Sequence, residues 1–264
     1  MDERGPLAAD TLPPHEIAAL KELERRNRDL GAAEQGPGQF YDKAAFRLRA
    51  ENRTYLRYLS PLAGETVLDA GAGLGRLALL VAPLAKRLVC VDLSAQALQV
   101  VGATADARGV RNIETVHADL CNLPRSLGPF DSAYAVEVVD HIPSHRERLA
   151  AVQTVHDLLR PGGRCLVSVH CWNPRSRRGG AEKEGFWGSG PRRLYHYYFS
   201  AHELRNLLHQ AGFRGIRLRG LIILPGRISR SLPTSLAVLE TWCSMVPACA
   251  RFGSLLIGMG RRPH

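Results

Sequence analysis

Three glycines at alternate positions follow a short apolar run, and this pattern suits the close approach of a ligand to the backbone. The segment, residues 67–76, reads VLDAGAGLGR. Glycine adopts the positive φ values of a sharp turn at little steric cost. A helix that begins after the turn presents free N–H groups and the positive end of its dipole. The dinucleotide-binding pattern G-x-G-x-x-G is not met, because Arg76 occupies the sixth position.

Carboxylates follow the next apolar runs along the chain. Asp92 ends the run 88–92, and its two oxygens can accept from both hydroxyls of a ribose. Asp119 follows the third run, and Glu137 follows the fourth. Ligands of parallel α/β sheets bind beyond the carboxyl ends of the strands, so we expect these side chains to lie at one cleft.

Two histidines stand at the same predicted edge and are candidate catalytic bases. His141 follows Glu137 in the segment EVVDHI, and His170 ends the fifth apolar run. An imidazole titrates near neutral pH, so either ring can take a proton from a bound substrate. Packing or helix capping is the competing interpretation for both. No metal site is predicted, because the six cysteines form no CxxC pair.

The elements that would position these residues alternate between strands and helices. Strands are predicted at 66–70, 88–92, 112–117, 131–136, 164–170, 215–224 and 253–260, and helices at 15–30, 39–59, 74–84, 94–108, 144–159, 201–210 and 233–247. Repeated β-α units of this length predict an α/β fold with a mainly parallel sheet and helices on both faces. Residues 171–198 interrupt the alternation and are interpreted as a long loop or arm.

The glycine turn resembles motif I of the class I S-adenosylmethionine-dependent methyltransferases. Asp92 and Asp119 stand where that family carries further acidic residues, and LLRPGG at 158–163 is similar to the family's turn before the fifth strand. FSAHEL at 199–204 and AGF at 211–213 resemble the family more weakly. The resemblance implies a Rossmann-like sheet of seven strands, mostly parallel, with the last strand antiparallel.

The resemblance also implies S-adenosylmethionine as the cofactor. Gly71 and Gly73 would line it, Asp92 would bind its ribose, and Asp119 would accept from the adenine amino group. The other implied contacts are Tyr41 and Asp69 at the methionine end, Leu93 and Leu120 beside the adenine ring, and Glu137. Arg47, Arg49 and Arg53 are candidates for the cofactor carboxylate, although solvent exposure explains them equally. Turn capping and core packing are the alternatives for the rest.

Residues 1–60 are predicted to form a helical lead-in and substrate cap. Residues 61–264 would form the cofactor-binding domain, with 171–198 as a substrate arm. The arm is rich in aromatics and arginines, and the chain has a formal net charge of +10, which suits a flat or anionic acceptor. No signal peptide or transmembrane run is recognised and the cysteines suit a reducing compartment, so we expect a cytoplasmic protein.

The favoured function is transfer of a methyl group from S-adenosylmethionine to an O, N or C nucleophile of a small organic molecule. A tRNA or RNA methyltransferase is an alternative, because RLYHYY at 193–198 faintly resembles wobble-uridine tRNA methyltransferases. A non-catalytic protein with a relict cofactor fold is a third interpretation, and the intact glycine turn argues against it. An acceptor at a membrane surface stays open, and the oligomeric state is not predicted.

Overall fold

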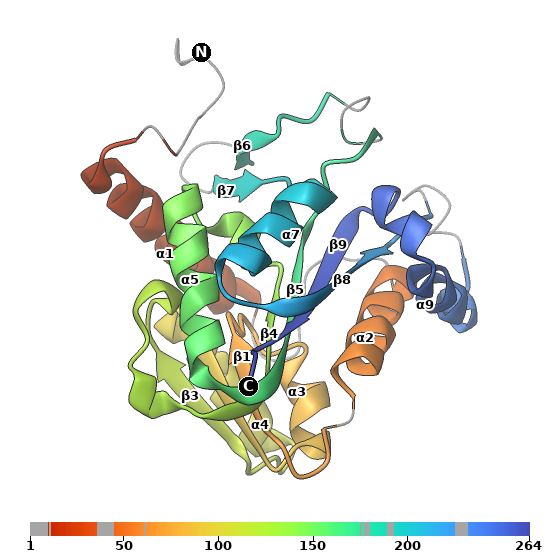
Figure 1. Ribbon diagram of the computed structural model, residues 1–264. Coiled ribbons are helices and arrows are strands. Elements are labelled where there is room, and N and C mark those ends of the chain that lie inside the picture. The colour runs from red at the N-terminus through yellow and green to blue at the C-terminus, as the bar shows by residue number, and fades with distance from the viewer. Residues whose placement is uncertain are drawn as a thin grey trace.

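The computed structural model describes residues 10, 12–35, 45–60, 62–174, 176, 180–188, 193–224 and 232–264. Seven strands in this part of the chain form one sheet in the order β3-β2-β1-β4-β5-β9-β8 (Figure 1). They are β1 (Thr66–Ala70), β2 (Arg87–Asp92), β3 (Ile113–His117), β4 (Phe130–Val136), β5 (Leu159–His170), β8 (Arg214–Leu221) and β9 (Leu255–Arg261). β9 pairs antiparallel with β5 and β8, and the other neighbours pair in parallel. The predicted fold class is therefore confirmed.

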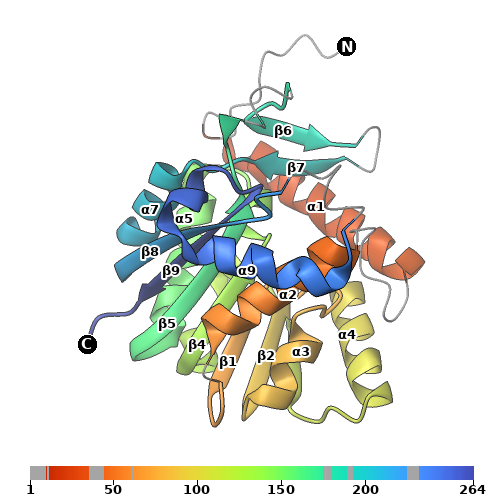
Figure 2. The same cartoon turned by 90° about the vertical axis from the view of Figure 1, so that its right-hand side faces the viewer.

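Helices cover both faces of this sheet (Figures 1 and 2). One face packs on α5 (His145–Leu158) and α7 (Ala201–Gln210). The opposite face packs on α2 (Ala45–Leu59), α3 (Ala78–Val81), α4 (Ala95–Ala107) and α9 (Ala237–Met245). A further helix, α1 (Pro14–Gln35), contacts α4 and lies near the edge of the sheet at which the parallel strands end. The two helical layers bury both sides of the central strands, as apolar runs in a parallel sheet require.

Local sequence signals explain where several helices begin and end. The hydroxyl of Ser94 accepts from the backbone N–H of Ala97, so Ser94 caps α4. Ser200 and Glu203 form a reciprocal capping box at the start of α7. The helix predicted at 74–84 is shorter than expected, because α3 gives way to a 3-10 turn at Ala82–Leu84. Pro83 lies in that turn and has no N–H to continue an α-helix.

The predicted arm contains regular structure that we did not expect from its sequence. Its described residues include a two-stranded antiparallel ribbon, β6 (Glu184–Trp187) and β7 (Leu194–Tyr197). Phe186 pairs with Tyr195 across the ribbon, and aromatic cross-strand pairs of this kind stabilise a hairpin. The ribbon lies above the sheet beside α1 in Figure 2. It therefore forms one wall of the space beyond the strand ends.

Candidate active site

The glycine turn after β1 lies so close to its neighbours that a side chain at Gly71 has no room. Gly71 has φ +93°, and its N–H donates to the carbonyl of Val91 over 2.8 Å. A Cβ at this position would come within 2.3 Å of Val138 Cγ2. Gly73 has φ +51°, but its Cβ would meet nothing among the described residues within 4 Å. Gly73 thus borders open space that a ligand can enter.

Asp92, at the end of β2, holds the glycine turn in place. Its carboxylate accepts from the N–H of Gly73 at 2.7 Å and from that of Ser94 at 2.9 Å. Burial raises the pKa of Asp92 above its ordinary value, and the two N–H donors oppose this rise. Each oxygen retains a lone pair for a further donor. The carboxylate is therefore positioned to accept from a ligand's hydroxyls, as the sequence predicts for ribose.

Asp119 is tied to the N-terminal helix, a contact that the sequence did not reveal. Its carboxylate accepts from the N–H of Cys121 and pairs with the ammonium of Lys21 in α1. Lys21 also binds Glu147 over 2.7 Å. Burial alone would raise the pKa of Asp119, but the ammonium of Lys21 and the N–H of Cys121 together outweigh burial and hold this pKa below its ordinary value. The ion pair of the Asp119 carboxylate with Lys21 therefore holds α1 against the end of this part of the sheet.

Asp69 lies at the base of the turn, shielded from solvent. Its carboxylate accepts from the Tyr134 hydroxyl at 2.8 Å. Burial raises the pKa of Asp69 to about 8, although the Tyr134 hydroxyl opposes the rise. The sequence predicted Asp69 at the methionine end of the cofactor, with turn capping as the alternative, and it did not indicate Tyr134 as a partner. A positive group bound nearby would stabilise the ionised form of this carboxyl.

One cavity of about 420 Å³ brings most of the predicted residues together. This volume lies within the range of sites for small ligands and cofactors. Ten of the eleven predicted site residues line it: Asp69, Gly71, Gly73, Asp92, Leu93, Asp119, Leu120, Glu137, His141 and His170. Tyr41, the eleventh, lies outside the described residues. The open space at Gly73 and the free lone pairs of Asp92 fit the adenosyl group of S-adenosylmethionine.

Two arginines reach the cavity near the glycine turn. Arg76 forms ion pairs with Glu51 at 3.2 Å and with Glu137 at 3.7 Å. Arg47 lines the cavity and binds the carboxylate of Glu51 at 2.8 Å. The sequence treated Arg76 only as a departure from the dinucleotide pattern, although its place in the first turn after the glycines was a usable signal. Either guanidinium can bind a ligand carboxylate.

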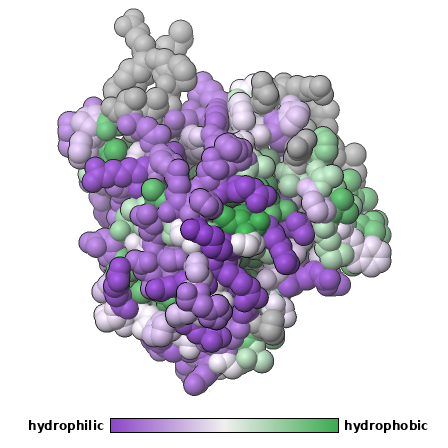
Figure 3. Space-filling view, viewed as in Figure 1, coloured by the Kyte–Doolittle hydropathy of each residue, from purple (hydrophilic) through white to green (hydrophobic). Residues whose placement is uncertain are grey.

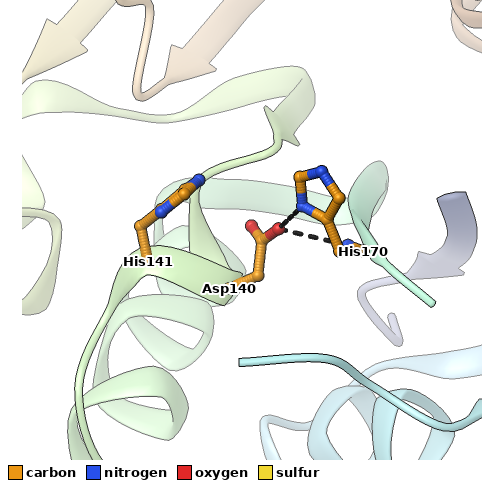
Figure 4. Close-up of side chains that lie close together, drawn as sticks. All are labelled: Asp140, His141 and His170. Atoms are coloured by element: carbon orange, nitrogen blue, oxygen red, sulfur yellow. Dashed lines mark hydrogen bonds and ion pairs between the residues drawn. The ribbon is translucent and has the colours of Figure 1, made fainter. Parts of the chain in front are cut away.

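His170 and Asp140 form a hydrogen-bonded pair beside this cavity (Figure 4). One oxygen of Asp140 accepts from the backbone N–H of His170 at 3.1 Å and also bonds to ring Nδ1. Burial by itself would raise the pKa of Asp140, but the imidazoles of His141 and His170 outweigh it and lower this pKa. An ionised Asp140 fixes the tautomer with the proton on Nδ1. The Nε2 lone pair of His170 is then available as a base.

Glu137 contacts the same imidazole from the end of β4. One of its carboxylate oxygens lies 3.9 Å from His170 Nε2. Glu137 has φ +57°, an uncommon value for a residue with a side chain. This backbone conformation occurs where the chain turns from β4 toward the segment that carries Asp140 and His141.

His141 is buried, and its ring contacts residues of the β6–β7 ribbon. Nδ1 donates to the carbonyl of Tyr195 in β7 over 2.7 Å, which leaves Nε2 as the acceptor in the neutral ring. The ring packs edge-on against Trp187, with centroids 5.5 Å apart. Figure 4 draws interactions between Asp140 and His170 but none that joins either of them to His141. The structure thus gives the two predicted bases different partners.

Asp140, His141 and His170 also place three potential metal-ligand atoms within 4.8 Å of one another. The sequence did not single out Asp140, and its signal was the carboxylate directly before His141. Carboxylate and imidazole groups are ligands for divalent cations. Both Nδ1 atoms are already bonded, to Asp140 and to Tyr195, so any cation would bind through Nε2. The absence of a metal from the chemistry stays a prediction.

Aromatic rings from the ribbon surround His170. Trp187 packs edge-on against this imidazole at 4.6 Å, and Tyr198 lies at 5.9 Å. His196 stacks on the Trp187 ring at 4.7 Å with an interplanar angle of 14°. Trp187 itself lines the cavity. This aromatic wall suits a flat organic ring that binds next to the Nε2 of His170.

The structure and sequence resemble those of known methyltransferases. The sequence model of the methyltransferase domain family matches residues 41–218. The ubiquinone biosynthesis O-methyltransferase of Dinoroseobacter shibae is 31% identical over 182 residues, covering 68% of this chain and 72% of that protein. O-methyltransferase resE of Aspergillus sclerotiorum is 26% identical and the match covers 59% and 57% of the two chains.

A solved structure shares the fold over the whole length. The 1,6-didemethyltoxoflavin-N1-methyltransferase of Burkholderia thailandensis, solved with S-adenosylhomocysteine, aligns with a TM-score of 0.62 at 21% identity, covering 100% of this chain and 97% of that one. The sheet order, the glycine turn and the family match together define a class I methyltransferase that uses S-adenosylmethionine. This chain belongs to that family. No helix among the described residues is long and apolar enough to cross a membrane.

Proposed function

We propose that this protein methylates a hydroxyl group on an aromatic ring of a small molecule. The observation that carries the proposal is the Asp140–His170 pair beside the aromatic wall. A phenolic hydroxyl has a pKa of about 10 and must lose its proton as the new bond forms. An amine can attack without a base, so an oriented imidazole favours an oxygen nucleophile.

The acceptor would lie between the wall and the cofactor. Trp187 offers a ring face or edge to a flat acceptor, and His170 Nε2 would take the hydroxyl proton. Bound S-adenosylmethionine supplies a methyl group already activated by its sulfonium. The chain's own contribution is alignment, which supplies on the order of 7–11 kcal/mol of barrier lowering. Proton removal by His170 adds about 10²- to 10⁴-fold.

The cofactor would be held along the row of strand ends. Asp92 would accept from the ribose hydroxyls and Asp119 from the adenine amino group. Lys21 keeps Asp119 ionised, and α1 would shield this side from water. The lead-in at 1–60 and the arm at 171–198 would enclose the acceptor from two sides. The relatives named for O-methylation support an oxygen nucleophile, and the N1-methyltransferase contributes only the fold.

The alternative of an RNA acceptor has less support. The segment that resembles tRNA methyltransferases has its Tyr195 only 1% exposed and His196 only 4% exposed. The Tyr195 hydroxyl donates to Glu184, and His196 stacks on Trp187. These rings are occupied within the ribbon and do not offer faces to nucleobases. The cytoplasmic location stays a prediction from the cysteine pattern.

A direct test would incubate the protein with methyl-labelled S-adenosylmethionine and three acceptor pools. The pools are soluble catechols, aromatic amines and total tRNA. We expect label on the catechol oxygen, and no label with Asp92→Ala, whose cofactor binding is impaired. Transfer to the amines or the tRNA, with no transfer to catechols, would overturn the proposal. Asp106→Ala changes an exposed carboxylate that does not line the cavity, so it is the matched control and should retain activity.

A further inference from the structure

An exposed apolar surface covers α9 and the turn after it. The described residues include eight large hydrophobic side chains that are exposed. Six of the eight lie between residues 236 and 252: Leu236, Leu239, Trp242, Met245, Val246 and Phe252. Trp242 is 60% exposed. In Figure 3 hydrophobic side chains gather at the right-hand edge, where Figure 1 places α9.

Charged residues are sparse in the part of the chain that forms this surface. Glu240 is the only charged residue between 232 and 250. It is buried, and its carboxylate accepts from the N–H groups of Ile223 and Leu224 at 2.9 and 2.8 Å. The Thr54 and Thr241 hydroxyls join α9 to α2 at 3.0 Å. The inner face therefore fixes the helix, and the apolar outer face is not needed for packing.

A stripe of arginines runs beside this apolar face. Arg49, Arg53 and Arg57 follow one another at intervals of four residues, so they share one side of α2. All three are exposed, and none forms an ion pair with a residue that the structure describes. Arg53 and Arg57 line a shallow surface pocket together with Trp242. The basic stripe and the apolar face thus form one continuous surface, here called the α2/α9 face.

We propose that the α2/α9 face docks on the surface of an anionic lipid bilayer. Apolar side chains flanked by arginines are the composition of interfacial membrane-binding helices. Tryptophan prefers the level of the lipid headgroups, and arginines bind anionic headgroups. A second copy of this chain fits less well, because a two-fold interface would bring each arginine stripe against its own copy. This docking goes beyond methyl transfer and does not depend on the identity of the acceptor.

The experiment measures co-sedimentation of the purified protein with two kinds of vesicle. One kind contains phosphatidylglycerol and phosphatidylcholine in equal parts, and the other contains phosphatidylcholine alone. We expect binding to the anionic vesicles and little to the neutral ones, with weaker binding as salt increases. Arg53→Gln with Arg57→Gln should weaken binding about 25-fold, at roughly fivefold per arginine. Arg146→Gln, an exposed arginine of α5, is the matched control.

The apolar contribution has its own pair of variants. Leu239→Ser with Trp242→Ser should weaken vesicle binding at least about tenfold. Leu84→Ser is the control, because Leu84 is 50% exposed outside the α2/α9 face. All variants act at exposed positions that do not line the cavity. Arg49 and Arg53, candidates from the sequence for the cofactor carboxylate, are not among its lining residues, whereas Arg47 is. Each variant should therefore keep its thermal unfolding midpoint and its cofactor affinity.

Any of four results would overturn the proposal. The first is no binding of the unaltered protein to the anionic vesicles, and the second is binding that the α2/α9 variants leave unchanged. The third is a dimer in analytical ultracentrifugation that Leu239→Ser with Trp242→Ser dissociates, which would assign the apolar face to self-association. Equal affinity for tRNA and for the vesicles would show a general polyanion surface and would also contradict specific lipid docking.

Discussion

Asp140 contacts His170 twice, through the backbone N–H and through ring Nδ1. The two contacts fix both the position and the tautomer of the imidazole. His170 ends β5, and Asp140 lies in the turn after β4, so two neighbouring strands place the pair. The arrangement resembles the orienting role of a carboxylate in hydrolase triads.

Replacing either member of this pair should slow methyl transfer and leave the cofactor bound. We expect His170→Ala and Asp140→Asn to lower kcat by about 10²- to 10⁴-fold, because proton removal is lost or the tautomer is no longer fixed. Steady-state kinetics with a catechol and calorimetry with S-adenosylhomocysteine would separate the two effects. His209→Ala, an exposed histidine of α7, should behave as the unaltered protein.

A chelator distinguishes the base from a metal site at the same residues. With His170 acting as a base, treatment with EDTA should not change kcat. Activity that EDTA removes and magnesium restores would instead assign Asp140, His141 and His170 to a cation.

Gly71 and Gly64 form a matched pair for testing the glycine turn. Both have positive φ, at 93° and 78°, but only Gly71 lies against a side chain, that of Val138. Gly64→Ala should cost about 1 kcal/mol of unfolding free energy from backbone strain. Gly71→Ala should cost roughly 1–3 kcal/mol more because of the added overlap. Denaturant unfolding of both variants measures this difference, and equal losses would contradict the packing argument.

Asp69 should make the cofactor-free protein less stable as the pH rises. Its pKa is raised from 3.8 to about 8 on folding, so between these values the folded state holds a proton that the unfolded chain has released. Folding then binds protons, and stability decreases with pH across this window and levels off above it. The Asp69→Asn variant lacks this loss of stability. The difference between its thermal unfolding midpoint and that of the unaltered protein should therefore increase with pH.

Thermal unfolding at about pH 5 and about pH 9 would measure the effect. Asp106→Asn provides the control, because Asp106 is exposed and does not line the cavity. A parallel dependence on pH in the Asp69→Asn and unaltered proteins would show that Asp69 is not the group responsible.

Trp187 should control acceptor binding more than chemistry. Its ring packs against His170 and lines the cavity, so Trp187→Ala removes one wall of the acceptor site. We expect KM for the acceptor to rise about 2- to 12-fold, the range of an aromatic pair, with kcat changed less. Trp187→Phe should recover most of the loss. A fall in kcat alone, with KM unchanged, would place the acceptor elsewhere.

The features predicted from the sequence are those that depend on neighbouring residues. Apolar runs that alternate with helical segments predicted the strands. The turn at 67–76, with Asp92 and Asp119, predicted the position of the cavity. Features formed by distant segments were missed. Lys21 reaches Asp119 from the N-terminal helix, and the ribbon brings Trp187 to His170. No local pattern encodes such contacts, because they depend on how the elements pack.

The ion pairs of Lys21 with Asp119 and Glu147 have a consequence for turnover. Lys21, Glu24 and Arg28 of α1 all line the cavity. If the spent cofactor leaves past this helix, α1 has to separate from the strand ends, and that separation breaks both ion pairs. Because salt screens such charges, the lifetime of the product complex should shorten as ionic strength increases. The opening of the N-terminal helix would then set the rate of product release in each catalytic cycle.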